Sequence, residues 1–529
     1  MLTNDSSLFS SSNNSNADMS NPGNQIDKKL QQRQELFSSE TNFNQIKENA
    51  ISSDLTLGSD ERAKIFRRKR FQAKLDIDSP EFLKDKLTIS PELYEECNNM
   101  TVKPEELQLY MQNFMSQDIA TKYRGIAGIR RLMSLPTNPP IQEMIDFGLV
   151  SAFIELLDSP YPEFQYEALF CLINIACGTT DQANSILVKG GLSKIINLMS
   201  SRIEEIQDHA IWTLGNLIGD SPKVRDQIFL QGGYDKLITV FSTAERPLLI
   251  KRCTWTIGNC CRVKPSPSYD VLKKALNSLI KGMNKLSTDH DFLSDACWIL
   301  SFMTENYKKS IKELMDTNVI PIIIKCLDIP VVFIQISCLR VIGNIASGNA
   351  NQTQQLIDWG IFPYLKKTIT NEKKSIRKET AWIISNIAAG TQRQIELLIM
   401  DNFLPILIDV IHHDEPEIQR EAIWAVCNLT SIEKKELMEV IIQQQIIEII
   451  CECLKSQDAK YLAVSLEAFG NLLSFGKKYS PNGENFVVKR AEMLGMIDYL
   501  EKLQFHPVEI VYEKMIKILE TYFDVENNA

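Results

Sequence analysis

One asparagine recurs along most of this chain at a nearly constant interval. It closes similar apolar stretches, among them AIWTLGN (210–216), CTWTIGN (253–259) and TAWIISN (380–386). Successive copies are separated by 42 or 43 residues, apart from one double step in which Phe302 stands at the missing position. The repeated residues, called the ladder asparagines below, are Asn174, Asn216, Asn259, Asn344, Asn386, Asn428 and Asn471.

A second landmark follows the same period and predicts the fold. Gly191 and Gly233 each follow a ladder asparagine by 17 residues and Gly360 by 16, and each precedes an apolar stretch, as a tight turn into a further helix requires. A period in the low forties with two or three helices per unit is typical of armadillo and HEAT repeats, which bury their apolar faces only by stacking. The sequence therefore predicts an all-α, right-handed superhelical armadillo-repeat solenoid of about ten repeats.

Composition divides the chain into four segments. Residues 1–55 are polar and too poor in apolar residues to offset chain entropy, so we expect them to be disordered. Residues 56–104 include ERAKIFRRKRFQAKLD (61–76), in which seven of the fifteen residues from 61 to 75 are Lys or Arg. We expect the solenoid over 105–524, where the helical pattern is nearly continuous, and a disordered tail over 525–529.

Bulk properties argue against several functional classes. A formal net charge of −10 argues against general nucleic-acid binding and favours basic partners. No apolar run approaches the ~18–20 residues of a membrane span, and the N-terminus lacks the apolar core of an export signal. Cys171, Cys253, Cys297, Cys338 and Cys427 fall inside apolar helical patterns, as reduced thiols do. We find no phosphate loop, nucleophile–base pair or metal-ligand spacing, so neither catalysis nor a metal or cofactor is expected.

The spacing of tryptophan and asparagine predicts a binding surface. Residues four apart share one face of a helix, so Trp212, Trp255 and Trp298 should form one row, with Asn216 and Asn259 in a second row. An asparagine amide can pair with the N–H and C=O groups of an extended peptide, and adjacent indoles leave slots for lysine or arginine stems. Because packed helices lie ~8–10 Å apart, each repeat would span about three residues of such a peptide.

Carboxylates complete this hypothesis, and a purely structural alternative stays open. Asp220, Asp295, Glu379 and Glu421 stand near the slots, the last three being one turn before a tryptophan. They would give the surface its specificity for positive charge. However, tryptophan in a repeat helix is more often part of the core, and asparagine can serve the fold by bonding to a neighbouring loop.

Several stretches resemble the importin-alpha family of nuclear import adaptors, over residues 105–524. DHAIWTLGNLIGDSPKVRD is similar to the family's third repeat, CTWTIGNCCRVKPSPS to its fourth, CLRVIGNIASGNANQTQ to its sixth and VYEKMIKILETYFD to its closing helix. The resemblance implies a non-enzymatic adaptor that shuttles between cytoplasm and nucleus. Its implied partners are basic nuclear localisation signals of cargo proteins, importin-beta, an export receptor with RanGTP, and nuclear pore components, without direct nucleic-acid binding or membrane insertion.

The resemblance also assigns two cargo sites, which together would hold bipartite signals because tethering makes the second contact intramolecular. Asp220 would be the carboxylate that clamps a lysine, and Arg340 is expected to pair with Glu379. The implied major site consists of Asn174, Trp212, Asn216, Asp220, Trp255, Asn259, Asp295 and Trp298. The implied minor site consists of Arg340, Asn344, Thr353, Glu379, Trp382, Ser385, Asn386, Glu421, Trp424 and Asn428.

Four positions around the major site depart from the family pattern. Phe170 stands where the family has its first tryptophan, and Ala183 replaces a threonine that contacts the key lysine. His209 and Arg252 replace polar neutral residues, each three positions before a tryptophan. The added cation at Arg252 should oppose basic ligands, so we expect the major site to be weaker or altered in preference.

The basic segment is similar to the start of the family's importin-beta-binding helix, which also competes with cargo for the acidic groove. Arg67, Arg68, Lys69 and Arg70 match its arginine cluster, whereas DIDSPEFLKDK replaces the basic stretch that follows. A nucleic-acid arm, a nuclear localisation signal of its own and a solvated linker are alternatives. For the whole chain, the alternatives are a catenin-type armadillo scaffold for acidic partners and a specialised adaptor for one fixed partner.

Overall fold

The computed structural model describes residues 88–523, with gaps at 136, 264, 481–482 and 504. Within these residues the chain is helical and contains no strand. The described parts of its two compact units are residues 88–310 and 311–523. The basic cluster Arg67, Arg68, Lys69 and Arg70, the predicted disordered region 1–55 and the tail 525–529 lie outside the described residues.

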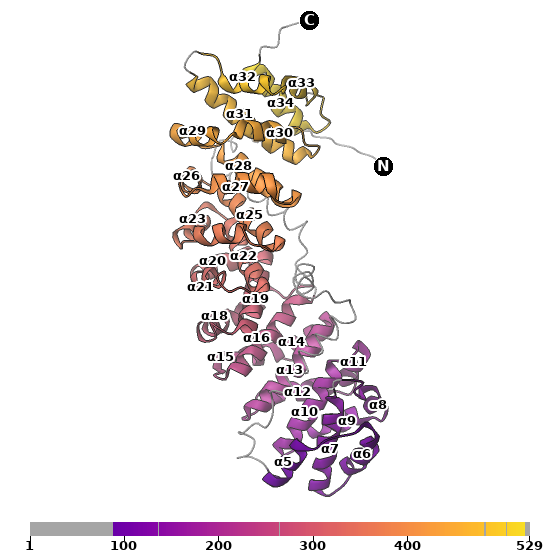
Figure 1. Ribbon diagram of the computed structural model, residues 1–529. Coiled ribbons are helices and arrows are strands. Elements are labelled where there is room, and N and C mark those ends of the chain that lie inside the picture. Colours follow the sequence, from indigo (N-terminus) through magenta and orange to yellow (C-terminus); the bar gives the residue numbers. More distant parts are fainter. Residues whose placement is uncertain (1–87, 136, 264, 481–482, 504, 524–529) are drawn as a thin grey trace, which may run out of the picture. The chain divides into compact units, whose positions relative to one another are not determined.

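The N-terminal unit is built from helices that recur in groups of three (Figure 1). Its elements are α5 (Pro91–Asn99), η1 (Pro104–Glu106), α6 (Leu107–Phe114), α7 (Ile119–Met133), α8 (Ile141–Asp146), α9 (Leu149–Leu156), α10 (Pro162–Ala176), α11 (Thr180–Val188), α12 (Gly191–Leu198), α13 (Glu204–Asp220), α14 (Pro222–Leu230), α15 (Gly233–Thr243), α16 (Pro247–Arg262), α17 (Tyr269–Leu272), η2 (Lys273–Ala275), α18 (Leu276–Lys285) and α19 (His290–Asn306). The longest helix of each group, called the third helix, packs on the next third helix, in the order α7, α10, α13, α16 and α19. α5 lies within the span 56–104 and packs on α7.

The C-terminal unit repeats this arrangement. Its elements are α20 (Lys308–Met315), which begins at the end of the N-terminal unit, α21 (Val319–Cys326), α22 (Val332–Ala346), α23 (Ala350–Asp358), α24 (Phe362–Ile369), α25 (Lys374–Ala388), α26 (Gln392–Met400), α27 (Phe403–His413), α28 (Pro416–Leu429), α29 (Lys435–Gln443), α30 (Ile446–Cys453), α31 (Ala459–Tyr479), α32 (Phe486–Met493), α33 (Ile497–Leu503) and α34 (Glu509–Tyr522). The third helices α22, α25, α28, α31 and α34 pack in sequence. The described chain thus contains ten third helices, in agreement with the predicted number of repeats.

Local sequence signals explain where these helices begin. At α11, the Thr179 side chain accepts a hydrogen bond from the Gln182 N–H, while the Gln182 side chain accepts one from the N–H of Thr179. The same capping box, which satisfies two orphan N–H groups at once, opens α23 and α26. Proline occupies the first residue of the third helices α10, α16 and α28, where its missing N–H costs nothing.

The turn between the first and second helix of a group corrects one detail of the sequence prediction. The left-handed residue is Gly190 or Gly232, with φ of 74° and 73°, not the glycine that follows it. Gly233 is instead the first residue of α15 and is required by close packing, because a Cβ there would lie 2.6 Å from Ile228 Cγ2. Gly360 takes the left-handed conformation itself, with φ of 79°.

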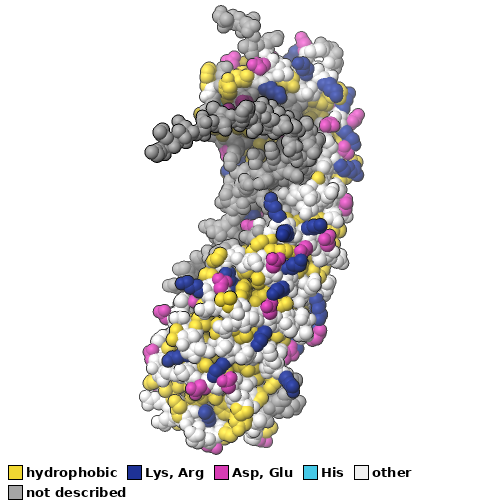
Figure 2. Space-filling view, turned by 180° about the vertical axis from the view of Figure 1, so that it is seen from behind, with side chains coloured by type: hydrophobic (Ala, Val, Ile, Leu, Met, Phe, Trp, Pro, Cys, Tyr) yellow, Lys and Arg dark blue, Asp and Glu magenta, His cyan; other side chains and the backbone are white. Residues whose placement is uncertain are grey.

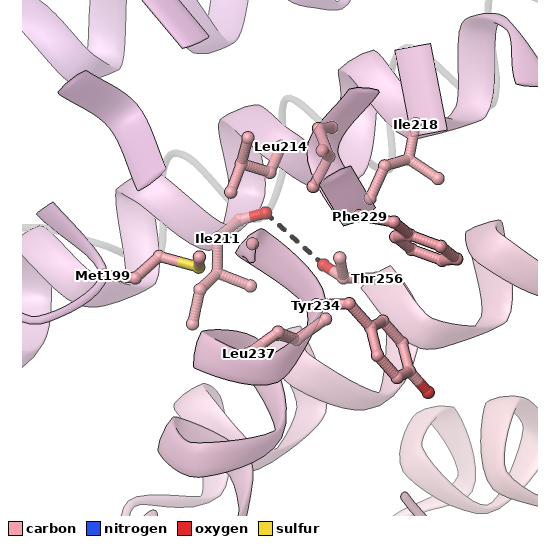
Figure 3. A pocket seen from close by; sticks show the side chains of 10 residues that line it. Met199, Ile211, Leu214, Ile218, Phe229, Tyr234, Leu237 and Thr256 are labelled. Atoms are coloured by element: carbon pink, nitrogen blue, oxygen red, sulfur yellow. Dashed lines mark hydrogen bonds between the residues drawn. The ribbon is translucent and has the colours of Figure 1, made fainter. Parts of the chain in front are cut away.

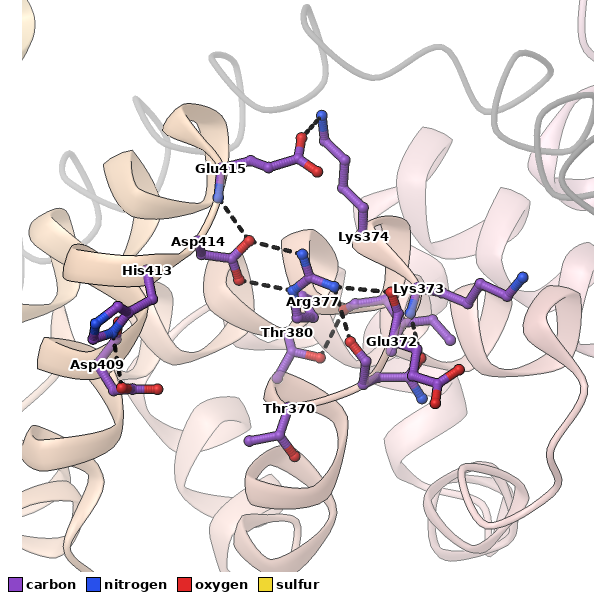
Figure 4. A network of polar contacts seen from close by, with 12 residues as sticks. Thr370, Glu372, Lys373, Lys374, Arg377, Thr380, Asp409, His413, Asp414 and Glu415 are labelled. Carbon is purple, nitrogen blue, oxygen red and sulfur yellow. Dashed lines mark hydrogen bonds and ion pairs between the residues drawn. The ribbon is translucent and has the colours of Figure 1, made fainter.

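Ion pairs between successive repeats add to this apolar stacking. In the C-terminal unit, Arg377 of α25 makes a bidentate contact with Asp414, which lies just before α28 (Figure 4). The two N–O distances are 2.7 and 2.8 Å, and both side chains are largely shielded from solvent. Such a forked pair fixes orientation as well as distance, so it sets how one repeat sits on the next. None of the described helices is long and apolar enough to cross a bilayer.

Candidate functional site: a ladder of asparagines on the third helices

Two ladder asparagines of the N-terminal unit each join a third helix to the preceding one. In the N-terminal unit, Asn216 Nδ2 of α13 donates a hydrogen bond to the carbonyl oxygen of Ile173 in α10 at 3.3 Å. Asn259 Nδ2 of α16 donates to the carbonyl oxygen of Gly215 in α13 at 2.9 Å. Each acceptor is the residue just before the preceding ladder asparagine. The amide nitrogen therefore has a role in the fold, as the structural alternative proposed.

The side-chain oxygens of these two asparagines do not take part in the contact between helices. The Oδ1 atoms of Asn216 and Asn259 are buried, and neither has a hydrogen-bond partner within the described residues. In the C-terminal unit, Asn428 Nδ2 likewise donates a hydrogen bond to the carbonyl oxygen of Ser385 at 3.4 Å. A ladder asparagine together with this contact to the preceding repeat is called a rung below. The ladder thus offers a fixed nitrogen and, at two adjacent rungs, an acceptor oriented by that nitrogen.

Burial of the tryptophans corrects the expected open row of rings. Trp255 and Trp424 are half-buried. Trp212, Trp298 and Trp382 expose only 2%, 4% and 1% of their surface. These three rings are therefore not the open slot walls that spacing predicted for Trp212 and Trp298 and that the resemblance implied for Trp382.

Glycines on the preceding helix explain how the rings pack. The Trp255 ring lies against Gly215, where an added Cβ would be 2.3 Å from its Cζ3 atom. The Trp382 ring lies in the same way against Gly343, with a corresponding distance of 2.0 Å. Both glycines immediately precede a ladder asparagine. The recurrent Gly-Asn pair in the sequence was the signal for this packing, and sequence reasoning overlooked it.

The predicted carboxylates occupy different environments. Asp220, the last residue of α13, is exposed and accepts a hydrogen bond from Thr180 Oγ1 at 2.8 Å. Asp295 and Glu421 are half-buried, and Glu421 Oε2 accepts a hydrogen bond from Ser385 Oγ at 3.0 Å. Glu379 is buried. Of the four, Asp220 is therefore the most accessible to a cation from solution.

The expected pair between Arg340 and Glu379 is confirmed, at 3.0 Å with both side chains buried. The Arg340 guanidinium also lies over the Trp382 ring, 5.7 Å from its centroid. The N-terminal unit contains an equivalent arrangement that the sequence did not reveal. There Arg130 of α7 pairs with Glu167 at 2.6 Å and lies 5.1 Å from the Phe170 ring centroid. Phe170 thus occupies the aromatic position of an inter-repeat cluster.

Two further departures from the family pattern pack together around Trp212. His209 is buried, with its ring centroid 4.4 Å from that of Tyr166 and 6.3 Å from that of Trp212. Burial lowers the pKa of His209 to about 4, and the imidazole Nδ1 contacts the Glu205 carbonyl at 2.8 Å. The Arg252 guanidinium carbon lies 3.6 Å from the Trp212 ring centroid.

The remaining predicted residues have structural contacts. Thr353 is buried, and its hydroxyl is within hydrogen-bonding distance of the carbonyl oxygens of Ala346 and Asn349, at 3.2 and 3.3 Å. Ala183, its counterpart, is buried as well. Asn174 Nδ2 lies 3.4 Å from Ser134 Oγ. Asn344 and Asn386, the two other minor-site ladder asparagines, are buried in α22 and α25.

One apolar void and one face of the described surface bear on other kinds of ligand. The apolar void bordered by Ile211, Tyr234 and Thr256 has a free volume of about 10 Å³, the space of one water molecule (Figure 3). On the face shown in Figure 2, the described Lys and Arg side chains are interspersed with Asp, Glu and apolar groups. That face therefore offers no continuous basic path for a phosphate backbone.

Comparison with known folds defines the class of protein. Residues 391–431, which contain α26, α27 and α28, match the Armadillo/beta-catenin-like repeat family. The crystal structure of an engineered protein from the Northeast Structural Genomics Consortium is similar, with a TM-score of 0.63 and 23% sequence identity. The match covers 78% of this chain and 98% of that chain. The fold is therefore that of an armadillo-repeat protein.

Curated relatives narrow the class to a family. Importin subunit alpha-1b of Oryza sativa subsp. japonica is 35% identical over 426 residues, which are 80% of this chain and 79% of the relative. Importin subunit alpha-B of Dictyostelium discoideum is 44% identical over 429 residues, 80% and 82% of the two chains. Importin subunit alpha-3 of Arabidopsis thaliana is 33% identical over 429 residues, 80% of each chain. The chain belongs to the importin subunit alpha family.

Proposed function

We propose that this chain is a nuclear import adaptor that binds the basic nuclear localisation signal of a cargo protein along its third helices. Relatives named as importin subunits support a general role in nuclear import rather than catalysis. The signal would lie extended across successive third helices, with its main chain on the ladder asparagines. In each unit, cationic side chains would lie beside the half-buried indole, Trp255 in the N-terminal unit and Trp424 in the C-terminal unit, and near the flanking carboxylates.

The half-used amides of Asn216 and Asn259 are the observation that carries this proposal. Each nitrogen is bonded to the preceding helix, and each Oδ1 is a buried acceptor without a partner in the described part of the chain. Leaving such an acceptor unsatisfied costs about 1–3 kcal/mol, which a peptide N–H would recover once the groups that cover the two oxygens move aside on binding. Adjacent helices ~8–10 Å apart match about three residues of extended peptide, so two rungs would hold one short segment.

Charge supports a cationic rather than an acidic ligand. Asp220 is exposed at the end of α13, and Asp295 and Glu421 are half-buried on α19 and α28. The formal net charge of −10 adds a long-range attraction for basic partners. Salt would weaken that attraction, because the Debye length is only about 8 Å at physiological ionic strength.

A double substitution of the two rungs tests the proposal directly. We expect Asn216→Ala with Asn259→Ala to weaken binding of a labelled Lys/Arg peptide at least about tenfold, because two main-chain contacts are lost. Asn471→Ala is the matched control. Asn471 Nδ2 donates to Thr430 Oγ1 at 3.2 Å, but this rung lies outside both proposed sites. Unchanged peptide affinity in the folded double variant would rule out the ladder as the cargo site.

A second part of the proposal concerns the carrier. Arg67, Arg68, Lys69 and Arg70 would bind importin-beta, and the chain would shuttle between cytoplasm and nucleus with an export receptor, RanGTP and nuclear pore components as further partners. Replacing the four basic residues by alanine in the full chain should abolish capture by importin-beta. If the same segment competes with cargo, the variant should also bind the peptide more tightly.

An adaptor dedicated to one fixed partner is a second candidate, because Arg252 covers the Trp212 ring at 3.6 Å. A panel of basic peptides separates the two functions. A general adaptor would bind several with affinities within about tenfold, whereas a dedicated one would bind a single sequence far more tightly. A catenin-type scaffold would instead prefer an acidic peptide.

A further inference from the structure

The Trp212 ring is covered by a cation that the chain itself supplies. Arg252 lies one turn before Trp255 in α16, and its guanidinium carbon is 3.6 Å from the centroid of the Trp212 ring in α13. At this distance the guanidinium carbon lies over the ring itself. Arg252 Nε also donates to Asp208 Oδ1 at 3.1 Å. The Arg252 and Asp208 side chains are only 11% and 6% exposed.

These contacts use the same two groups that a bound lysine or arginine would need. A cation held between repeats requires an indole face for its stem and charge, and a carboxylate to complete the pairing. Here the indole is Trp212, and the carboxylate is Asp208, one turn before it on the same helix. Because Arg252 already contacts both, a ligand cation would compete with Arg252 for the ring and for the carboxylate.

A second side chain packs near Trp212. His209 is buried, and its ring centroid lies 6.3 Å from that of Trp212 and 4.4 Å from that of Tyr166 in α10. Together with Arg252, this packing agrees with the 2% exposure of Trp212.

We infer that Arg252 occupies the cation slot between Trp212 and Trp255, so that the N-terminal unit selects peptides with a neutral or acidic residue at that position. This inference rests on the proposed cargo-binding function and specifies its ligand. Basic residues of the peptide are then accommodated beside Trp255, whose ring is half-buried rather than covered. Arg252 is a specificity-determining residue, because it decides which side chain the first slot accepts.

The test is peptide binding by the full chain, with labelled hexalysine as the probe. We expect Arg252→Gln to bind hexalysine roughly tenfold more tightly, because the ring face and the Asp208 carboxylate are both released to the ligand. Lys251→Gln is the matched control. This variant removes the same charge from the adjacent residue, whose Nζ atom lies 3.0 Å from Asp289 Oδ2. It should change the affinity less than about twofold.

A second variant guards against misfolding of the first. Arg252→Gln leaves the largely buried Asp208 without its ion pair, whereas Asp208→Asn with Arg252→Gln removes both charges together. The double variant opens the ring without the carboxylate, so it should bind hexalysine more tightly than the native chain but less tightly than Arg252→Gln. A hexalysine affinity at or below the native value in both variants, with melting temperatures showing that they are folded, would overturn the inference.

The outcome also separates this inference from the proposed function. If hexalysine binds the native chain and Trp424→Ala weakens it, while the Arg252 variants leave affinity unchanged, only the role of Arg252 is wrong. If hexalysine and Lys/Arg peptides bind neither the native chain nor any variant, both the cargo-binding proposal and the role of Arg252 are wrong.

Discussion

The side-chain nitrogen of Asn259 donates a hydrogen bond to the carbonyl oxygen of Gly215 at 2.9 Å, across the junction between two repeats. The ring of Trp255, one turn before Asn259, lies against the same glycine. One small residue therefore receives both side chains that define the repeat. The absence of a Cβ at this position is what lets the indole and the amide approach the helix backbone together.

The first prediction concerns this glycine. We expect Gly215→Ala to destabilise the chain by about 1–3 kcal/mol, because its Cβ would lie 2.3 Å from Trp255 Cζ3 and force the ring to move. Binding of a basic peptide should weaken as well, since the displaced ring is part of the proposed site. Urea unfolding and peptide titration measure the two effects.

Gly219 supplies the control within the same helix. A Cβ there would meet Asn259 Nδ2 at 3.6 Å, an ordinary van der Waals distance. Alanine is the better helix former, so Gly219→Ala should leave stability unchanged or raise it by up to about 1 kcal/mol. Equal destabilisation by the two substitutions would contradict the role assigned to Gly215.

The second prediction concerns the inter-repeat pair of Arg130 and Glu167, which are 2.6 Å apart and largely buried. Glu167→Gln should lower stability by about 3–5 kcal/mol, because breaking a buried pair leaves an uncompensated charge. The exposed pair of Arg124 and Glu96 is the comparison, and Glu96→Gln should have no measurable effect. The urea concentrations at the unfolding midpoints of the two variants measure both effects. Similar decreases in the two midpoints would show that burial of the ion pair does not determine its contribution to stability.

The third prediction is a pH dependence of stability that arises from His209. Its pKa is lowered by burial to about 4 in the folded chain, against an ordinary value of 6.5. Between these values the unfolded chain binds more protons at this residue, so the contribution of His209 to stability should be constant above about pH 6.5 and fall as the pH is lowered towards 4. The loss attributable to this residue is at most about 3 kcal/mol.

Thermal melting of His209→Gln across this pH range isolates the contribution. The variant should lose less stability than the native chain between pH 7 and pH 5, because glutamine does not titrate. His413→Gln, which changes an exposed histidine beside Asp409, should preserve the native slope. If the melting temperature of His209→Gln fell with pH as steeply as that of the native chain, groups other than His209 would cause the pH dependence.

The fourth prediction separates covered from accessible indoles. Trp255 and Trp424 are half-buried, so Trp255→Ala and Trp424→Ala should weaken binding of a basic peptide about tenfold with moderate loss of stability. Trp212 is buried beneath Arg252, so Trp212→Ala should lower stability by about 3–5 kcal/mol. Where Trp212→Ala remains folded, its peptide affinity should change less than that of Trp255→Ala. The reverse order would mean that the ring beneath Arg252 is the one that holds cargo.

Sequence periodicity was sufficient to predict the all-α repeat architecture. Most repeats form the same junction with their neighbour, so asparagine recurs at the same position in seven of the ten third helices of the described chain. The pair between Arg340 and Glu379 was also expected, but the resemblance to the importin-alpha family supplied that expectation, because Arg340 stands where the family has its inter-site arginine. The spacing of the repeat alone places Arg340 at the position of a tryptophan, 42 residues before Trp382.

The details that could not be predicted depend on residues that break the repeat. Spacing placed Trp212 in a row of rings, but its burial depends on Arg252 of the next repeat and His209 beside it. Arg130 lies in a repeat without the tryptophan and asparagine landmarks, so its pairing with Glu167 had no pattern to reveal it. Side-chain contacts between repeats decide such cases, and a single sequence does not state which neighbours meet.

The hydrogen bonds donated by the side-chain nitrogens of Asn216 and Asn259 each connect two successive repeats. A peptide bonded to the oxygens of successive rungs would connect those junctions between repeats to one another. Cargo binding would then change a mechanical property of the adaptor as well as its chemistry. The chain with bound peptide would be less extensible than the chain without it, so the same pulling force would lengthen it less.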